Sequence, residues 1–165
     1  MQDPLLELGV VELVAALLDA GETVAAAESL TAGLFTAAVA SVPGSSAVLR
    51  GGLVVYATDL KATLAGVDPA ELAADGPVSA PTAIALAAGA QRRCEADWGI
   101  GLTGVAGPSE QDGQPVGTVF LGIAGPDGTT CERLSLKGER WEIRTSAVET
   151  AVSRLCDRVG VDRAR

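Results

Sequence analysis

Short apolar segments alternate with helical segments through the first hundred residues of this 165-residue chain, and a pair of strands follows them. Strands are predicted over residues 23–28, 53–58, 98–103, 118–124 and 130–136. The turn Gly125-Pro126-Asp127-Gly128 joins the last two strands as a hairpin. This order predicts an α/β protein, a single three-layer α/β/α domain over residues 1–165 with a mixed, mostly parallel sheet and a late hairpin.

Helical periodicity and end signals complete this pattern. The first helix is expected to begin at Asp3-Pro4 and to stop at Gly21, since aspartate caps a helix and glycine ends one. The other helices are predicted over residues 29–41, 79–95 and 139–159, with short ones around residue 61 and after residue 68. Residues 41–51 and 104–117 are predicted to be loops.

The charge balance limits the classes of partner. Twelve basic residues against twenty-one acidic ones give a net charge of −9, whereas proteins that bind nucleic acid or anionic membranes without specificity carry a basic face. The N-terminus lacks the basic start of a signal peptide, and no run reaches the roughly 18 apolar residues of a membrane span. The three cysteines are far apart and odd in number, which favours a reduced, cytoplasmic protein. We expect no direct nucleic-acid partner and no membrane partner.

Histidine is absent from the chain. This excludes Ser-His-Asp and Cys-His catalysis and histidine-ligated metal sites, and the cysteines show no CxxC spacing. No metal site is therefore predicted. A base acting near neutral pH would have to be a perturbed lysine, carboxylate, tyrosine or the terminal amine, and the chain has two lysines and one tyrosine.

Three segments follow predicted strands, where open α/β sheets bind their ligands. The first, ESLTAG (28–33), places Ser29 at a turn from strand to helix, where the hydroxyl is exposed and the following amides can stabilise an anion. Alternatively, Ser29 or Thr31 only caps the helix. Glu28 is either a ligand-facing residue or a structural carboxylate.

The second segment, YATDLK (56–61), carries Tyr56 and Lys61. The chain uses ten arginines and two lysines, and lysine, unlike arginine, can lose its proton. A desolvated lysine can activate a serine, as in Ser-Lys hydrolases. The alternative is a solvated helix lysine.

The third segment, TGVAGPSEQDGQPVGT (103–118), is a long loop rich in glycine. It matches neither the Walker A pattern nor GxGxxG, which disfavours ordinary ATP or dinucleotide binding. Its amides could approach a phosphate or a tetrahedral intermediate, or the segment is a plain surface loop.

Two arginines extend the apolar stripe of the last helix towards its N-terminus. Arg144 and Arg140 lie four and eight residues before Val148, respectively, on the line of core-facing residues. An arginine in this position needs an anion, which is either a carboxylate of the protein or a ligand phosphate.

These motifs together resemble the C-terminal domain of the competence/damage-inducible protein CinA, a family that includes nicotinamide mononucleotide deamidases. The resemblance runs from about residue 10 to residue 159. It rests on AESLTAG (27–33), residues 42–67, GPVS (76–79), TGVAGP (103–108), PVGTV (115–119) and GERWEIR (138–144).

The resemblance implies a cytoplasmic amidohydrolase of pyridine-nucleotide recycling that needs no cofactor. Such an enzyme converts nicotinamide mononucleotide to nicotinate mononucleotide and ammonia, and it is expected to be a homo-oligomer. The implied catalytic residues are Ser29 as nucleophile or water-orienting group, Lys61 as base and Tyr56, which holds Lys61 or the amide. The implied substrate-binding residues are Glu28, Thr31, Gly33, Thr103, Gly104, Ala106, Gly107, Arg140 and Arg144.

The chain departs from the family pattern in two places. Leu30 and Ala32 stand where the family often has cysteine and glycine, and SEQDGQ (109–114) replaces a glycine-rich stretch that ends in lysine. The alternative function is a non-catalytic module that senses nucleotides or binds protein, linked to competence or recombination.

Overall fold

The computed structural model describes residues 3–160 of the chain. One sheet has the strand order β2-β1-β3-β4-β5, with β1 (Val24–Glu28), β2 (Leu49–Val54), β3 (Trp98–Gly104), β4 (Thr118–Gly125) and β5 (Gly128–Ser135). The α-helices are α1 (Val10–Ala20), α2 (Leu34–Ala40), α3 (Thr58–Thr63), α4 (Pro69–Asp75), α5 (Ala80–Arg93) and α6 (Arg140–Cys156). Short 3₁₀ turns span Pro4–Leu8 and Ser45–Ala47.

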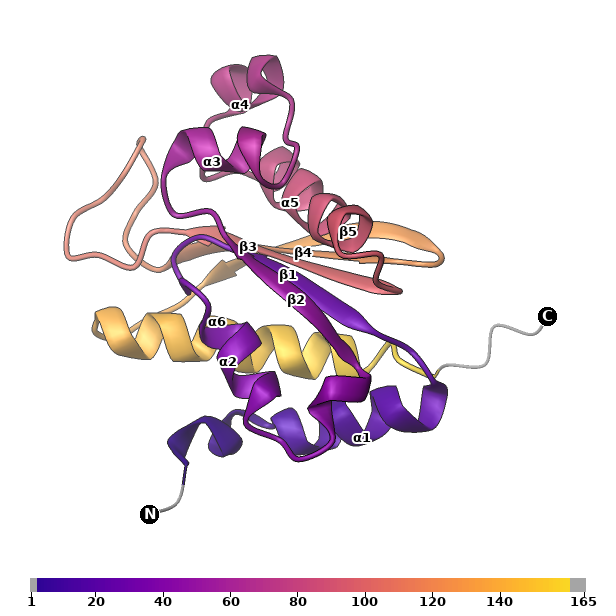
Figure 1. The fold of residues 1–165 in the computed structure, drawn as a ribbon. Coiled ribbons are helices and arrows are strands. Elements are labelled where there is room, and N and C mark those ends of the chain that lie inside the picture. The colour runs from indigo at the N-terminus through magenta and orange to yellow at the C-terminus, as the bar shows by residue number, and fades with distance from the viewer. Residues whose placement is uncertain (1–2, 161–165) are drawn as a thin grey trace.

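The sheet is mixed. Strand β1 pairs in parallel with both β2 and β3, whereas β4 is antiparallel to β3 and to β5. Helices α1, α2 and α6 cover one face, and α3, α4 and α5 lie over the other (Figure 1). The predicted α/β fold with a mixed sheet and a late hairpin is confirmed.

The residues of β1 are all buried because the strand lies inside the sheet and both faces are covered. Val24 and Ala26 belong to the larger core, formed with α1, α2 and α6. Ala25 and Ala27 face the smaller core, beneath α5. Alternate side chains of one strand thus hold the two helical layers together.

Glycine lets α5 approach the sheet closely. A Cβ atom added at Gly99, Gly101 or Gly122 would overlap the main-chain oxygens of Ala83 or Ala87 on this helix. The small residues of β3, β4 and α5 therefore fix the separation of these two layers.

Three predicted boundaries are wrong. The first helix divides into a 3₁₀ turn and α1, because Gly9 takes the left-handed conformation with φ 76°. Strand β2 begins at Leu49 and ends at Val54, since its pairing with β1 recruits two glycines that sequence propensity assigns to a loop. Helix α2 begins at Leu34, after two successive residues with positive φ.

Candidate active site

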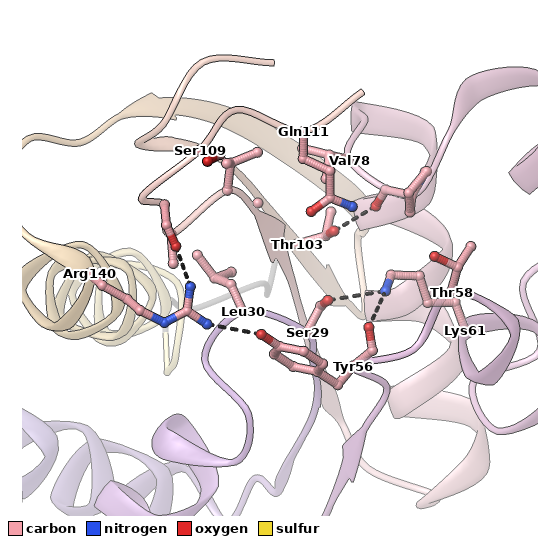
Figure 2. A pocket seen from close by; sticks show the side chains of 15 residues that line it. Ser29, Leu30, Tyr56, Thr58, Lys61, Val78, Thr103, Ser109, Gln111 and Arg140 are labelled. Atoms are coloured by element: carbon pink, nitrogen blue, oxygen red, sulfur yellow. Dashed lines mark hydrogen bonds between the residues drawn. The ribbon is translucent and has the colours of Figure 1, made fainter. Parts of the chain in front are cut away.

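A pocket opens where the parallel strands β1, β2 and β3 end. Its cavity has a volume of about 200 Å³ and is formed by the turn after β1, the start of α3, the segment before α5, the loop after β3 and the start of α6 (Figure 2). The lining residues are Ser29, Leu30, Tyr56, Thr58, Lys61, Pro77, Val78, Thr103, Gly104, Val105, Ala106, Gly107, Ser109, Gln111 and Arg140. This lining contains no aspartate or glutamate, although the whole chain carries a net charge of −9.

Ser29 and Lys61 meet at the base of this pocket. Lys61 Nζ lies 3.0 Å from Ser29 Oγ, a hydrogen-bonding distance between residues 32 apart in sequence. Lys61 is 2% exposed, so it is not a solvated helix lysine, and Ser29 is 8% exposed. The expectation of an exposed Ser29 hydroxyl is wrong, because this side chain lies beside the buried amine of Lys61. The structure therefore brings together the hydroxyl and the amine that the sequence analysis singled out.

Two main-chain carbonyls hold the amine of Lys61 from its other side. Nζ donates to the carbonyl oxygen of Val55 at 2.9 Å and to that of Tyr56 at 3.5 Å. Burial lowers the pKa of Lys61 from its ordinary value of 10.5, because a charged amine loses solvation inside the protein. A neutral amine has two N–H groups and one lone pair. The two N–H groups can donate to the two carbonyls, and the lone pair can then accept from the Ser29 hydroxyl.

The turn that carries Ser29 is fixed by Glu28 on its inner side. One carboxylate oxygen of Glu28 accepts from the amide of Phe35 at 2.8 Å, and the other accepts from the amide of Thr36 at 3.0 Å and from its hydroxyl at 2.7 Å. Glu28 is fully buried. Its carboxylate thus satisfies the first amides of α2, which otherwise lack an acceptor.

Arg140 spans the opposite side of the pocket. Its guanidinium donates to the hydroxyl of Tyr56 at 2.9 Å and to the carbonyl oxygen of Gly107. Figure 2 shows Arg140 and Lys61 on opposite sides of the Ser29 hydroxyl. Arg140 therefore joins the start of α6, the loop after β3 and the segment after β2.

The segment before α5, which forms part of the pocket lining, is held by the hydroxyl of Thr103. This hydroxyl donates to the carbonyl oxygen of Pro77 at 2.6 Å, and the side chain is fully buried. The hydroxyl of Thr82 donates to the carbonyl oxygen of Gly76 at 2.7 Å. These two bonds hold the segment that presents Pro77 and Val78 to the cavity.

The structure brings eight of the predicted site residues into the pocket lining and places four outside it. Those inside are Ser29, Tyr56, Lys61, Thr103, Gly104, Ala106, Gly107 and Arg140. Those outside are Glu28, Thr31, Gly33 and Arg144.

The four residues outside the lining belong to the turn between β1 and α2 or contact it. Both carboxylate oxygens of Glu28 are used by α2, and Gly33 occupies the N-cap position of that helix. The guanidinium of Arg144 donates to main-chain carbonyls instead of reaching the pocket. Thr31 is fully buried, and its hydroxyl has no hydrogen-bond partner among residues 3–160.

The hydroxyl of Tyr56 bonds to Arg140 and not to Lys61. Its hydroxyl accepts from Arg140, and the side chain is 56% exposed, whereas its carbonyl oxygen faces Lys61. The first alternative, that the tyrosine side chain holds Lys61, is therefore wrong, because the amine is held by main-chain oxygen. The second alternative, that this side chain holds the substrate amide, stays a prediction.

Sequence reasoning missed seven lining residues. The loop supplies Val105, Ser109 and Gln111, and other segments supply Leu30, Thr58, Pro77 and Val78. Thr58 and Ser109 lie inside the segments 56–61 and 103–118, which the sequence analysis did identify. The sequence did not indicate that these two side chains face the cavity. Pro77 and Val78 lie in GPVS, a motif that had no assigned role in chemistry.

Within residues 3–160, no group of three His, Cys, Asp or Glu side chains is arranged to hold a metal ion. Over the same residues, no helix combines the length and apolar character that a membrane crossing requires.

Comparison with known sequences agrees with the motifs. Residues 9–159 match the CinA C-terminal domain. A CinA-like protein of Frankia casuarinae is 50% identical over 136 residues, which cover 82% of this chain and 31% of that protein. A CinA-like protein of Anaeromyxobacter sp. is 47% identical over 144 residues, which cover 87% of this chain and 35% of that protein. The chain thus spans about a third of the length of these curated relatives.

Solved structures show the same fold. The competence/damage inducible protein CihA from Agrobacterium tumefaciens has a TM-score of 0.88 and 33% sequence identity, with 95% of this chain and 96% of that chain covered. A competence-damaged protein (CinA) superfamily protein from Klebsiella pneumoniae has a TM-score of 0.90 and 26% identity, with 95% and 98% covered.

Proposed function

This chain belongs to the CinA C-terminal domain family, and from that premise we propose that it hydrolyses the carboxamide of nicotinamide mononucleotide to nicotinate mononucleotide and ammonia. The observation that carries the proposal is the buried pair of Ser29 and Lys61, with 3.0 Å between Oγ and Nζ. A serine hydroxyl needs an adjacent base to attack an amide, and this pair supplies one without histidine.

In the first step Lys61 acts as a neutral amine. Its lone pair takes the proton of the Ser29 hydroxyl while Oγ forms a bond to the carboxamide carbon. The carbonyls of Val55 and Tyr56 hold the two N–H groups, so the lone pair is directed at Ser29. The lowered pKa of Lys61 raises the fraction of the amine that is neutral near pH 7.

The second step releases ammonia. The ammonium of Lys61 returns its proton to the amide nitrogen, the C–N bond breaks, and an ester on Ser29 remains. Water then attacks this ester and gives one proton to Lys61, after which the C–O bond to Ser29 breaks and Oγ recovers a proton. Lys61 gives this proton to Oγ, and the second proton of the water leaves the new carboxylic acid and is taken up by ammonia. The products are the carboxylate, ammonium and the free enzyme.

Main-chain amides supply the oxyanion site. Leu30, Ala106 and Gly107 line the pocket, and within the described part of the chain their N–H groups donate to no protein acceptor. Leu30 directly follows the nucleophile, as does one oxyanion donor in many serine hydrolases. Such fixed donors stabilise the negative oxygen of the tetrahedral intermediate.

Arg140 binds the anionic end of the substrate. It is the lining cation besides Lys61, and the lining has no carboxylate to compete for it. Two of its N–H groups are held by Tyr56 and Gly107, which leaves three for a phosphate.

The test is ammonia release from nicotinamide mononucleotide by purified protein, with Ser29→Ala beside the wild type. The wild type is expected to turn over the nucleotide, and Ser29→Ala is expected to lose about a thousandfold or more in kcat. Ser109→Ala is the matched control, since it removes an exposed hydroxyl from the same lining and should retain activity within about threefold.

Two results would contradict the proposal. Full turnover by a folded Ser29→Ala protein would remove the nucleophile. Binding of the nucleotide without turnover by the wild type would favour the non-catalytic sensing module.

A further inference from the structure

We propose that Arg144 is a positioning residue that fixes the turn carrying Ser29, and that it makes no contact with the substrate. This inference rests on the proposed role of Ser29 as nucleophile. Arg144 Nε donates to the carbonyl oxygen of Leu30 at 2.9 Å, and a terminal nitrogen donates to that of Thr31 at 3.0 Å. These are the two residues that directly follow the serine.

The turn needs such an anchor because its backbone is strained. Ala32 has φ 49° and Gly33 has φ 94°, so two successive residues lie in the left-handed region. For alanine this conformation costs about 1–2 kcal/mol. The 30–31 segment is buried, so its carbonyls have little access to water. The guanidinium donates to both oxygens, and the Thr31 oxygen also accepts from the amide of Leu34 at 3.0 Å. Arg144 thereby helps to hold the strained conformation in place.

The same bonds bear on the chemistry. A peptide unit is planar and trans, so a fixed carbonyl also fixes the direction of the amide that follows it. Anchoring the carbonyls of Leu30 and Thr31 therefore fixes the amides of Thr31 and Ala32. The Ala32 amide donates to the Ser29 carbonyl at 3.0 Å, and that carbonyl shares its peptide plane with the Leu30 amide, which we assign to the oxyanion site. It also restrains the position of Ser29 Oγ relative to Lys61 Nζ.

Arg144 is held where it cannot serve the pocket. Its guanidinium lies 5.5 Å from the ring centroid of Trp141 and donates to the carbonyls of Leu30 and Thr31, and Arg144 is not among the residues that line the cavity. Arg140, one helical turn earlier, lines the cavity instead. Two arginines that the sequence treats alike thus have separate roles, one on the substrate side and one beneath the nucleophile.

The planar fork of arginine suits this role better than lysine. One guanidinium reaches two neighbouring carbonyls at once, whereas an ammonium is a compact point donor. The informative variant is therefore Arg144→Lys, which keeps the charge and loses the paired geometry. Arg140→Lys is the matched control on the same helix.

The first measurement compares kcat and KM for nicotinamide mononucleotide and for nicotinamide riboside, which lacks the phosphate. Arg144→Lys should lower kcat about 10- to 100-fold for both substrates and leave the ratio of their kcat/KM values unchanged. Arg140→Lys should change that ratio, because it acts on the phosphate. A change of the ratio by Arg144→Lys would overturn the proposal.

The second measurement is hydrogen exchange of residues 29–34 in the two variants. Arg144→Lys should accelerate exchange in this turn, and Arg140→Lys should not. Unchanged exchange in the turn would overturn the proposal. A wild type without deamidase activity would defeat the proposed function alone, and hydrogen exchange would then decide the role of Arg144.

A third variant guards against misfolding. If Arg144→Lys does not fold, Arg144→Gln is used, since its amide can donate to one of the two carbonyls. It should show the same accelerated exchange and the same unchanged substrate ratio.

Discussion

The side of the pocket that carries Ser29 and Lys61 is buried, and main-chain carbonyls hold the amine of Lys61. Lys61 is 2% exposed, and Glu28, which lies outside the lining, supports the Ser29 turn and is fully buried against α2. The opposite wall is formed by the loop at residues 105–117 and by Arg140. Residues 108–113 of this loop are exposed, as is Arg140.

The difference separates two tasks. A base needs burial, because desolvation lowers its pKa, and a nucleophile needs fixed geometry. Recognition of a charged phosphate can be done at a wetter surface, where a cation keeps much of its solvation. We expect substitutions in the buried wall to affect kcat and stability, and those in the exposed wall to affect KM.

The largest effect is expected at the base. Lys61→Met keeps the length of the side chain and removes the amine, so kcat should fall roughly 10²- to 10⁴-fold. The measurement is steady-state deamidation beside Lys137→Met, which removes the other lysine of the chain from an exposed site. Equal activity of the two variants would show that the buried amine is not the base.

The pH dependence follows from the same residue. Activity should rise with pH as Lys61 loses its proton, with an inflection below 10.5 because burial lowers its pKa. Between the lowered pKa and 10.5 the unfolded chain binds more protons than the folded one. The free energy of unfolding of the wild type should therefore rise with pH over this range relative to Lys61→Met. An inflection at 10.5 or above would contradict the desolvated amine.

The next effect concerns stability. In the wild type, each carboxylate oxygen of Glu28 accepts from an amide at the start of α2. Glu28→Gln replaces one of these oxygens with an NH₂ group, so one of the two amides loses its acceptor. We expect a loss of about 2–3 kcal/mol in the free energy of unfolding, or roughly 5–10 °C in Tm. Thermal unfolding measures this, with the exposed Glu12→Gln on α1 as control. A Tm equal to that of the control would show that the carboxylate does not hold the turn.

A smaller effect is expected on the exposed wall. Arg140→Gln removes the lining cation, so KM for nicotinamide mononucleotide should rise about tenfold while kcat stays within about threefold. The exposed Arg92→Gln on α5 is the control for lost charge. If the phosphate-free riboside lost as much, Arg140 would not act on the phosphate.

The smallest effect is expected at Gln111. Its side chain lines the pocket from the exposed loop and is uncharged, so Gln111→Ala should change kcat/KM by less than about threefold. A loss of tenfold or more would place this part of the loop with the fixed machinery and would break the division between the walls.

Much of the fold was predictable because its signals are local. The side chains of Asp68 and Ser79 cap the helices that they were expected to start, and the hairpin β4–β5 forms around the predicted turn. Strand β2 was misplaced because its glycines carry no strand signal of their own. The motifs located Ser29, Lys61 and Tyr56, but they did not indicate that the hydroxyl of Tyr56 bonds to Arg140 and not to Lys61.

By itself, the sequence determined the order of helices and strands and the segments that leave the sheet, since caps, turns and apolar periodicity act over a few residues. Only the tertiary structure decided three contacts: Glu28 accepts from the first amides of α2, Arg140 lines the pocket, and Arg144 donates to the carbonyls of the turn after Ser29. The bond from Arg144 to Leu30 joins residues 114 apart in sequence. No local pattern encodes such a contact, because the partner reaches the guanidinium only after the layers of the fold have packed.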